Sequence, residues 1–187
     1  MRAGASWTVG AALVVAAWLV TFATPPVDAR DAPFVVTATA GVPAAGRDIA
    51  VTVHEFRRAR SISAVATAGG EWSAEGNWLV VDLDAASVVT TTGVLMNLAT
   101  LRLDDGRLYE ASTRPESLYR HALTAGIPRT GSIVFELPAA LEAGTATLRL
   151  GLNVDDRLDS VIEIEVPMTS LEVAAEERLV PTGWASP

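Results

Sequence analysis

The sequence predicts an all-β fold, an antiparallel β-sandwich of about seven to eight strands preceded by an N-terminal hydrophobic helix. Three observations predict it. A charge-free run extends from Ala3 to Val27, several later segments alternate apolar and polar residues with a period of two, and clusters of Gly, Pro and Asp separate these segments. No long segment after the apolar run has the period of an amphipathic helix, which disfavours a parallel α/β sheet.

Residues 1–30 are interpreted as a signal peptide or an uncleaved membrane anchor. Residues 5–24 have the length of roughly 20 apolar residues that a helix needs to cross a bilayer. A cleavable signal peptide fits as well, because Arg2 gives a basic start and both Thr21-Phe22-Ala23 and Val27-Asp28-Ala29 place small residues before a possible cut. A buried core helix is the third alternative.

The charges around this run set the expected orientation. Arg2 is the basic side chain that precedes the apolar residues, so the positive-inside rule places the N-terminus in the cytoplasm and the rest of the chain outside. We therefore expect either a single-pass protein of the cell membrane that contacts the bilayer through residues 5–24, or a protein secreted after cleavage.

Strand patterns dominate after residue 31, and residues 31–168 are expected to form one β-sandwich domain. In the segment from Asn77 to Ala85, the side chains of Leu79, Val81 and Leu83 share one face, which predicts a half-buried strand. Further strands are expected at Phe34–Thr39, Ile49–Ala59, Leu95–Leu103, Gly131–Leu137, Thr145–Leu152 and Ser160–Val166.

Local signals between and after these strands predict the connections. Asp105-Gly106, flanked by alternating apolar residues from Leu101 to Tyr109, predicts a tight hairpin. Val65–Gly76 is expected to be a long exposed loop, because it contains three glycines and no sustained pattern. Residues 169–187 are expected to form a short helix and a loose tail, since Thr169 and Glu172 have the spacing of a capping box.

Composition excludes several classes of function. The chain has no Cys, which excludes disulfides and thiolate metal sites. Of its 22 acidic residues only Asp28 precedes residue 31, and of its 14 basic residues only Arg2 and Arg30 do, so residues 31–187 carry a formal charge of −9. A nucleic-acid partner is not expected for so acidic a domain.

Candidate catalytic and metal-binding residues are few. The Gly-x-Ser-x-Gly motif is absent and the two histidines, His54 and His121, have no partner identifiable from spacing, so no enzyme and no cofactor are expected. Hard cations prefer clustered oxygen ligands, and the densest acidic cluster predicts a weak calcium candidate, with a solvated turn as the alternative. Its residues are Asp155, Asp156 and Asp159, with Asn153, Glu163 and Glu165 nearby.

Partner-binding candidates are aromatic and basic residues. Trp72 and Trp184 are candidates for contact with a partner, and Trp184 alternatively packs on its own domain. Arg57, Arg58 and Arg60 form the basic concentration of the chain. They are expected to pair with its abundant acids; contact with lipid headgroups or with a carboxylate on a partner is the alternative.

The succession of motifs resembles a known family. Gly46–Val53, Arg58–Ile62, Gly76–Leu83, Leu101–Tyr109 and Thr130–Pro138 together resemble the domain of unknown function 4352 family, across residues 34–167. Members of that family are secreted or membrane-anchored bacterial domains similar to the mycobacterial immunoprotective extracellular protein. The resemblance implies an immunoglobulin-like sandwich and an extracytoplasmic interaction module, without catalytic residues.

One segment departs from the family pattern. Family members usually have an Asn-containing segment after the centre strand, whereas Ala86–Gly93 here continues with apolar and β-branched residues. Taken together, the sequence predicts a non-catalytic binding domain of the bacterial cell envelope that contacts an unidentified envelope or membrane protein. A small-ligand or calcium-binding domain is the alternative.

Overall fold

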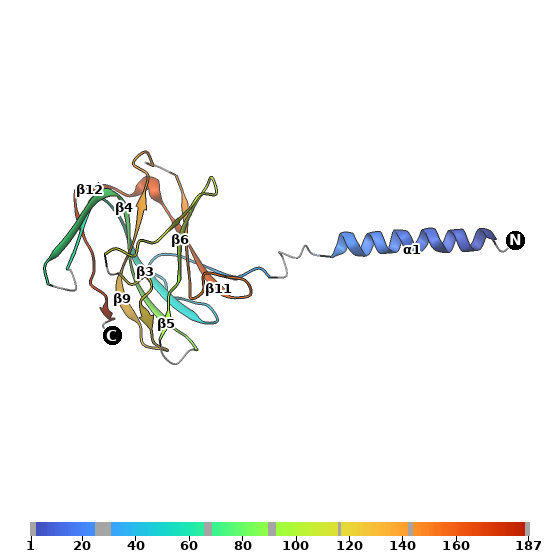
Figure 1. The fold of residues 1–187 in the computed structure, drawn as a ribbon, viewed down its shortest axis with the longest axis horizontal. Helices are drawn as coiled ribbons and strands as arrows, with labels where there is room; N and C mark the ends of the chain where they lie inside the picture. Colours follow the sequence, from blue (N-terminus) through green and yellow to red (C-terminus); the bar gives the residue numbers. More distant parts are fainter. Residues whose placement is uncertain are drawn as a thin grey trace. The chain divides into compact units, whose positions relative to one another are not determined.

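The computed structural model describes residues 3–24, 31–65, 69–89, 93–115, 117–141 and 144–185. It divides the chain into two compact units, Met1–Ala32 and Pro33–Pro187. The first contains the helix α1 (Ala3–Ala23) and the second contains the strands (Figure 1). The prediction of an all-β sandwich preceded by an N-terminal hydrophobic helix is confirmed.

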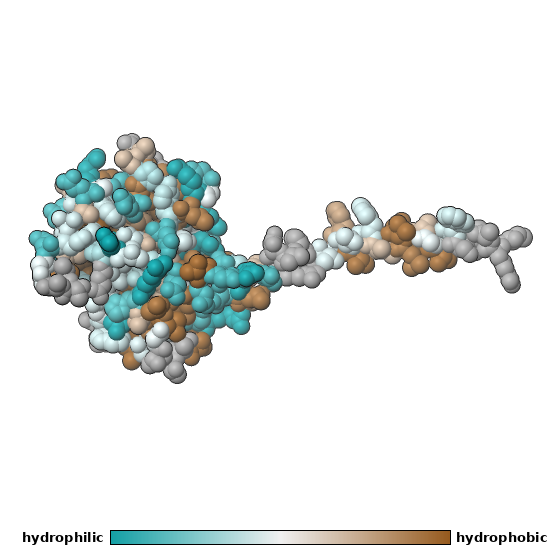
Figure 2. Space-filling view, viewed as in Figure 1, coloured by the Kyte–Doolittle hydropathy of each residue, from teal (hydrophilic) through white to brown (hydrophobic). Residues whose placement is uncertain are grey.

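The side chains of α1 from Trp7 onward are exposed on every side of the helix. Its large apolar residues range from 54% exposed at Leu19 to 82% exposed at Trp7. Figure 2 shows brown, hydrophobic residues interleaved with paler ones along the helix. The hydroxyl of Thr21 donates to the carbonyl oxygen of Ala17 at 2.9 Å, so this polar group is satisfied within the helix. Within the described residues, no helix combines the length and the hydropathy required to span a membrane. The cleavage motif Val27-Asp28-Ala29 lies outside the described residues.

Two main sheets face each other in the second unit. The first has the order β1-β11-β10-β6-β7, and the second has the order β12-β3-β4-β9-β14, with β2 and β13 also paired to β3. A small third sheet joins β5 to β8. The bounds are β1 Phe34–Ala38, β2 Ala44–Ala45, β3 Ile49–Val65, β4 Glu71–Ser87, β5 Val94–Leu95, β6 Leu98–Leu103, β7 Leu108–Glu110, β8 Ala122–Leu123, β9 Arg129–Leu137, β10 Ala146–Gly151, β11 Ser160–Val166, β12 Val173–Ala174, β13 Glu177–Arg178 and β14 Gly183–Trp184, with a 3₁₀ turn η1 at Met168–Ser170.

Each of the seven strands predicted from alternation is present within the described residues. Pairing is antiparallel in the centre of both sheets, but β1 runs parallel to β11, and β12 and β13 run parallel to β3. The strands beyond the predicted seven have only two or three residues, too few to give a pattern in the sequence. The hairpin with Asp105-Gly106 joins β6 to β7, and Gly106 has a φ of +84°, as the tight turn requires.

The main core lies between the two large sheets. Leu79, Val81 and Leu83 of β4 are fully buried there, which is the face that the alternation predicted. Leu148 and Leu150 of β10 are buried in the same cluster from the opposite sheet. Alternating apolar residues on both inner faces therefore hold the sheets together, as in other sandwiches.

The prediction of a long exposed loop at Val65–Gly76 is wrong. β3 and β4 stay paired as far as Val65 and Glu71, so most of this segment is a β-ribbon. Ile62 and Ala64 of this ribbon pack with Trp78, Val80 and other residues in a second, smaller core, with Trp72 and Ala74 against it. Trp72 and Ala74 alternate with Glu71, Ser73 and Glu75, but this run is short and lies between glycines at positions 69, 70 and 76.

The prediction of a short helix and a loose tail at residues 169–187 is also wrong where the structure describes this segment. The hydroxyl of Thr169 does not cap a helix; it donates to the carbonyl oxygen of Gly144 at 3.3 Å and accepts from its N–H. Residues 171–185, the C-terminal strap, pair with β3 through β12 and β13 and with β9 through β14. The strap thus joins two strands that β4 separates, and Leu179 in its middle is buried in the second core.

Candidate functional site

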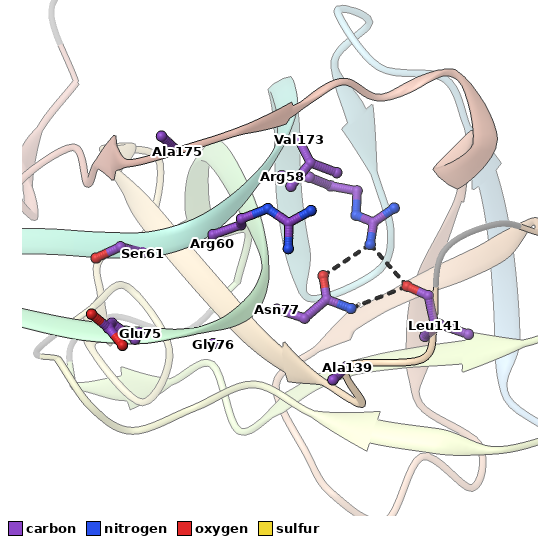
Figure 3. A pocket seen from close by; sticks show the side chains of 10 residues that line it. All are labelled: Arg58, Arg60, Ser61, Glu75, Gly76, Asn77, Ala139, Leu141, Val173 and Ala175. Atoms are coloured by element: carbon purple, nitrogen blue, oxygen red, sulfur yellow. Dashed lines mark hydrogen bonds between the residues drawn. The ribbon is translucent and has the colours of Figure 1, made fainter.

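A pocket of about 630 Å³ lies where the strap, the ribbon and the segment after β9 meet. Its polar wall comes from β3 and β4, and its apolar wall comes from Ala139, Leu141, Val173 and Ala175 (Figure 3). A β-bulge shapes the polar wall. Ala59 lies opposite Trp78 and Ser61 lies opposite Glu75, so two residues of β4, Gly76 and Asn77, face the single residue Arg60.

Arg58 is buried in this pocket, with 4% of its surface exposed. Its Nη2 donates to Asn77 Oδ1 at 2.9 Å and to the carbonyl oxygen of Leu141 at 2.9 Å. The amide of Asn77 in turn donates to the carbonyl oxygens of Leu141 and Pro138, at 3.0 and 2.8 Å. These bonds fix the guanidinium and join β3 and β4 to the segment after β9 (Figure 3).

Arg60 extends into the same pocket from the next position on that side of β3 (Figure 3). Its side chain is exposed. Ser61 and Glu75 face each other one step nearer the tip of the ribbon. The pocket therefore has a cationic part at Arg58 and Arg60 and a carboxylate at its outer end.

The indole N–H of Trp78 lies behind Gly76, which lines the pocket. Trp78 is 4% exposed, and its Nε1 has no acceptor among the described residues. A side chain at position 76 would place its Cβ 2.9 Å from this nitrogen, so glycine is what permits the close approach. A buried donor without an acceptor is costly, and such groups often mark a place where a ligand or water supplies the acceptor.

Arg57 has a different role from its two neighbours. Its Nη2 donates to Asp82 Oδ2 at 2.6 Å, its Nη1 donates to Glu177 of the strap, and Asp82 also accepts from the hydroxyl of Ser132. The amide of Val180 donates to that hydroxyl at 2.8 Å. Internal pairing with acids was expected for the arginines, and Arg57 follows it; its network fastens the strap to β3, β4 and β9.

The acidic turn between β10 and β11 does not bring its carboxylates together. Asp155 pairs with Arg157 at 2.6 Å. Arg149 pairs with both Asp156, at 2.8 Å, and Glu163, at 2.9 Å. Asp159 accepts from Asn153. Among the described residues no group of three His, Cys, Asp or Glu side chains is placed to hold a metal ion. The hydrogen bond from Arg157 lowers the pKa of Asp155 to about 2.

Asp48 and Asp159 form a carboxyl pair that titrates unusually. Burial, followed by the hydrogen bond and the repulsion between the two side chains, raises the pKa of Asp48 to about 6. The pKa of Asp159 is lowered: burial acts to raise it, but the hydrogen bonds from Asn153 and Asp48 outweigh burial. At pH 5 the pair therefore holds one proton, on Asp48.

The raised pKa of Asp48 predicts a pH-dependent stability. The folded state keeps this proton up to about pH 6 whereas the unfolded state loses it near 3.8, so the stabilisation is lost as the pH rises through 6. Asp48→Asn keeps a donor to Asp159 at every pH. We expect the variant to melt at a higher temperature than the parent at pH 7.5, with a smaller difference at pH 5.

The control for this measurement is His54→Gln, which removes the pair between His54 and Asp84 and leaves Asp48 and Asp159 in place. This variant should keep the parent's decline in melting temperature between pH 5 and pH 7.5. Equal declines in Asp48→Asn and the parent would contradict the assignment to Asp48.

The histidines and tryptophans singled out in the sequence do not line the pocket at Arg58 and Arg60, which we call the arginine pocket. His54 pairs with Asp84 at 3.0 Å, and His121 Nδ1 accepts from the amide of Ala122 at 2.9 Å. Trp72 packs on the second core. Trp184 is 55% exposed, and the guanidinium of Arg129 lies 3.9 Å from its ring centroid, so it packs against its own domain.

Comparison with known proteins finds no matching family model and no matching curated protein. Among solved structures, an uncharacterised β-sandwich protein from Clostridium difficile 630 is 9% identical, with a TM-score of 0.51 over 76% of this chain and 99% of that chain. The secreted protein MPT63 from Mycobacterium tuberculosis is 13% identical, with a TM-score of 0.49 over 71% and 99% of the two chains. The first of these neighbours is thus a β-sandwich protein, and at 9% identity the likeness establishes the fold alone.

Proposed function

We propose that this chain is an exported, non-catalytic binding domain of the bacterial cell envelope, and that the arginine pocket is its binding site. The observation that carries the binding role is the pocket itself. A fixed, buried guanidinium and a second, exposed one share a solvent-open cavity that has an apolar wall. Binding sites commonly combine apolar walls with a few oriented polar groups.

The apolar surface of α1 supports export. A helix that exposes Leu, Val, Trp and Phe on every side has no polar face for water, and its large apolar residues need another cover. A signal peptide and a membrane anchor both have their apolar residues covered by the membrane during transport. An envelope protein is then the expected partner, and the family resemblance seen in the motifs agrees with that place.

The residues that could do chemistry support a binding role over an enzymatic one. His54 and His121 take part in separate local contacts, and the carboxylates of the acidic turn each have an arginine or asparagine partner. A nucleophile needs an adjacent, oriented base, and neither histidine is hydrogen-bonded to a hydroxyl in the described part of the chain.

Cell fractionation followed by N-terminal sequencing of the mature protein tests export. A start within residues 22–31 in the soluble extracellular fraction indicates cleavage, and an intact N-terminus in the membrane fraction indicates an anchor. Either result supports the proposal. An intact protein in the cytoplasmic fraction would contradict it.

A further inference from the structure

We propose that the edge strand β1 pairs with β1 of a second copy of this chain, so that two sandwiches form an antiparallel dimer through one continuous sheet. This inference goes beyond the proposed binding function and does not depend on it. β1 (Phe34–Ala38) is the end strand of its sheet and pairs with β11. Among the described residues no strand pairs with the other side of β1. An edge strand with an open side is a template for another strand.

The other sheet edges are protected in ways that β1 is not. In the second sheet, the strap covers β3 through β12 and β13 and covers β9 through β14. At the opposite end of the first sheet, β7 has only three residues and ends in a glutamate. β1 has five residues, and residues 32–46 around it contain no charged side chain. Short length, charge and a covering segment protect an edge, and within the described part of the chain β1 has none of them.

The open side of β1 presents the backbone groups of Val35 and Thr37. The amide of Phe34 donates to the carbonyl oxygen of Asp159 at 2.8 Å, next to the first residue of β11. In a parallel pair every second residue directs its N–H and C=O towards the neighbouring strand, so Val36 also faces β11. The N–H and C=O groups of Val35 and Thr37 therefore point out of the sheet, where a further strand can meet them.

β1 is complementary to itself when the second copy runs antiparallel. With Val36 opposite Val36, each Val35 lies opposite Thr37 of the other copy and exchanges both backbone hydrogen bonds with it, as the outward groups require. β-Branched residues opposite each other favour strand pairing. Phe34, which is 47% exposed, then lies opposite the small Ala38, so its ring has room over the neighbouring strand. The two sheets continue into each other with their core faces on the same side.

Charge also favours β1 as the place where two copies meet. The chain has a net charge of −8, so two copies repel each other at long range. Residues 32–46 carry no charge, and Glu163, which lies beside Thr37 on β11, pairs with Arg149 at 2.9 Å. Two copies thus approach through this segment without placing like charges opposite each other. The contact between two short strands is small, so the dimer is weak.

Sedimentation equilibrium of the full-length protein in a density-matched detergent tests the dimer. We expect the average molar mass to rise towards twice that of the chain between about 10 µM and about 1 mM protein. The rise should begin at a lower concentration in higher salt, because salt screens the repulsion between two acidic copies. A protein that stays monomeric up to about 1 mM would overturn the proposal.

Two proline variants locate the contact. Thr37→Pro removes an outward N–H and leaves the hydrogen bonds to β11, so the variant should stay folded and lose the dimer. Leu108→Pro is the matched control: it lies in β7 at the opposite edge of the same sheet, is 59% exposed and directs its N–H away from β6. It should dimerise like the parent. Melting temperatures establish folding, and an unchanged dimer in Thr37→Pro would overturn the proposal.

A charge pair tests the direction and register of the strands without proline. Residue 35 of one copy lies opposite residue 37 of the other, so a mixture of Val35→Lys and Thr37→Glu places a lysine opposite a glutamate. Its heterodimer should be severalfold tighter than the one formed by Leu108→Lys and Thr37→Glu, which carry the same net charges. Equal affinities of the two mixtures would overturn the antiparallel pairing of β1 with itself.

Discussion

Ending the chain after Ser170 is expected to destabilise the sandwich severely, although this removes a segment that looks like a loose tail in the sequence. The truncation removes Leu179 from the second core, removes Glu177 from Arg57, and exposes the backbone edges that β12, β13 and β14 cover. We expect the free energy of unfolding to fall by more than about 5 kcal/mol, a large part of a typical domain's stability. Uncovered edges also favour aggregation.

A point variant keeps this prediction measurable if the truncated chain does not fold. Leu179→Ala should lower the free energy of unfolding by about 3 kcal/mol and the melting temperature by about 6 to 12 °C. Val180→Ala is the matched control, because that side chain is 38% exposed whereas Leu179 is 5% exposed. Equal melting temperatures for the two variants would show that the strap does not pack as described.

Replacing Asp82 by alanine is expected to have the second largest effect. The side chains of Asp82 and Arg57 are 13% and 16% exposed, and Asp82 also accepts from Ser132, which in turn accepts from the strap. Removing the carboxylate leaves a largely buried guanidinium with fewer partners. We expect a loss of about 2 to 3 kcal/mol in denaturant unfolding.

Glu55→Ala is the control for Asp82, since both carboxylates face the same arginine. Glu55 is 65% exposed and its oxygen lies 3.9 Å from Arg57 Nε, so its removal should change stability by less than about 1 kcal/mol. A loss for Asp82→Ala no larger than that for Glu55→Ala would contradict a structural role for this network.

The sequence pattern predicted the central strands correctly because successive side chains of a strand point to opposite faces of the sheet, and this alternation is visible in the sequence. Leu79, Val81 and Leu83 face the main core, as their spacing requires. Trp78 and Val80 on the other face were expected to be exposed on a half-buried strand, yet both are buried. They are covered by Leu179, which is far away in sequence, and by the ribbon, which includes a glycine-rich segment. No periodicity within β4 could reveal either of these.

Of the residues in the arginine pocket, only the arginines could be singled out from the sequence. Regular alternation separates Arg57 from Arg58 and Arg60, and the structure agrees, since Arg57 joins the strap network while the other two line the pocket. The partners could not be predicted, because Asn77 and the carbonyl of Leu141 meet Arg58 through strand register and a bulge. Gly76 beside a tryptophan two residues later is the one local signal of that bulge.

Display of the sandwich outside the cytoplasm is the central proposal, and the absence of cysteine from the chain allows a direct measurement of it. Ala140 is exposed, so Ala140→Cys provides one accessible thiol. Intact cells are treated with a maleimide that does not cross membranes, and lysed cells serve as the reference. We expect the protein to be labelled in intact cells to the same extent as after lysis. Labelling that occurs only after lysis would contradict it.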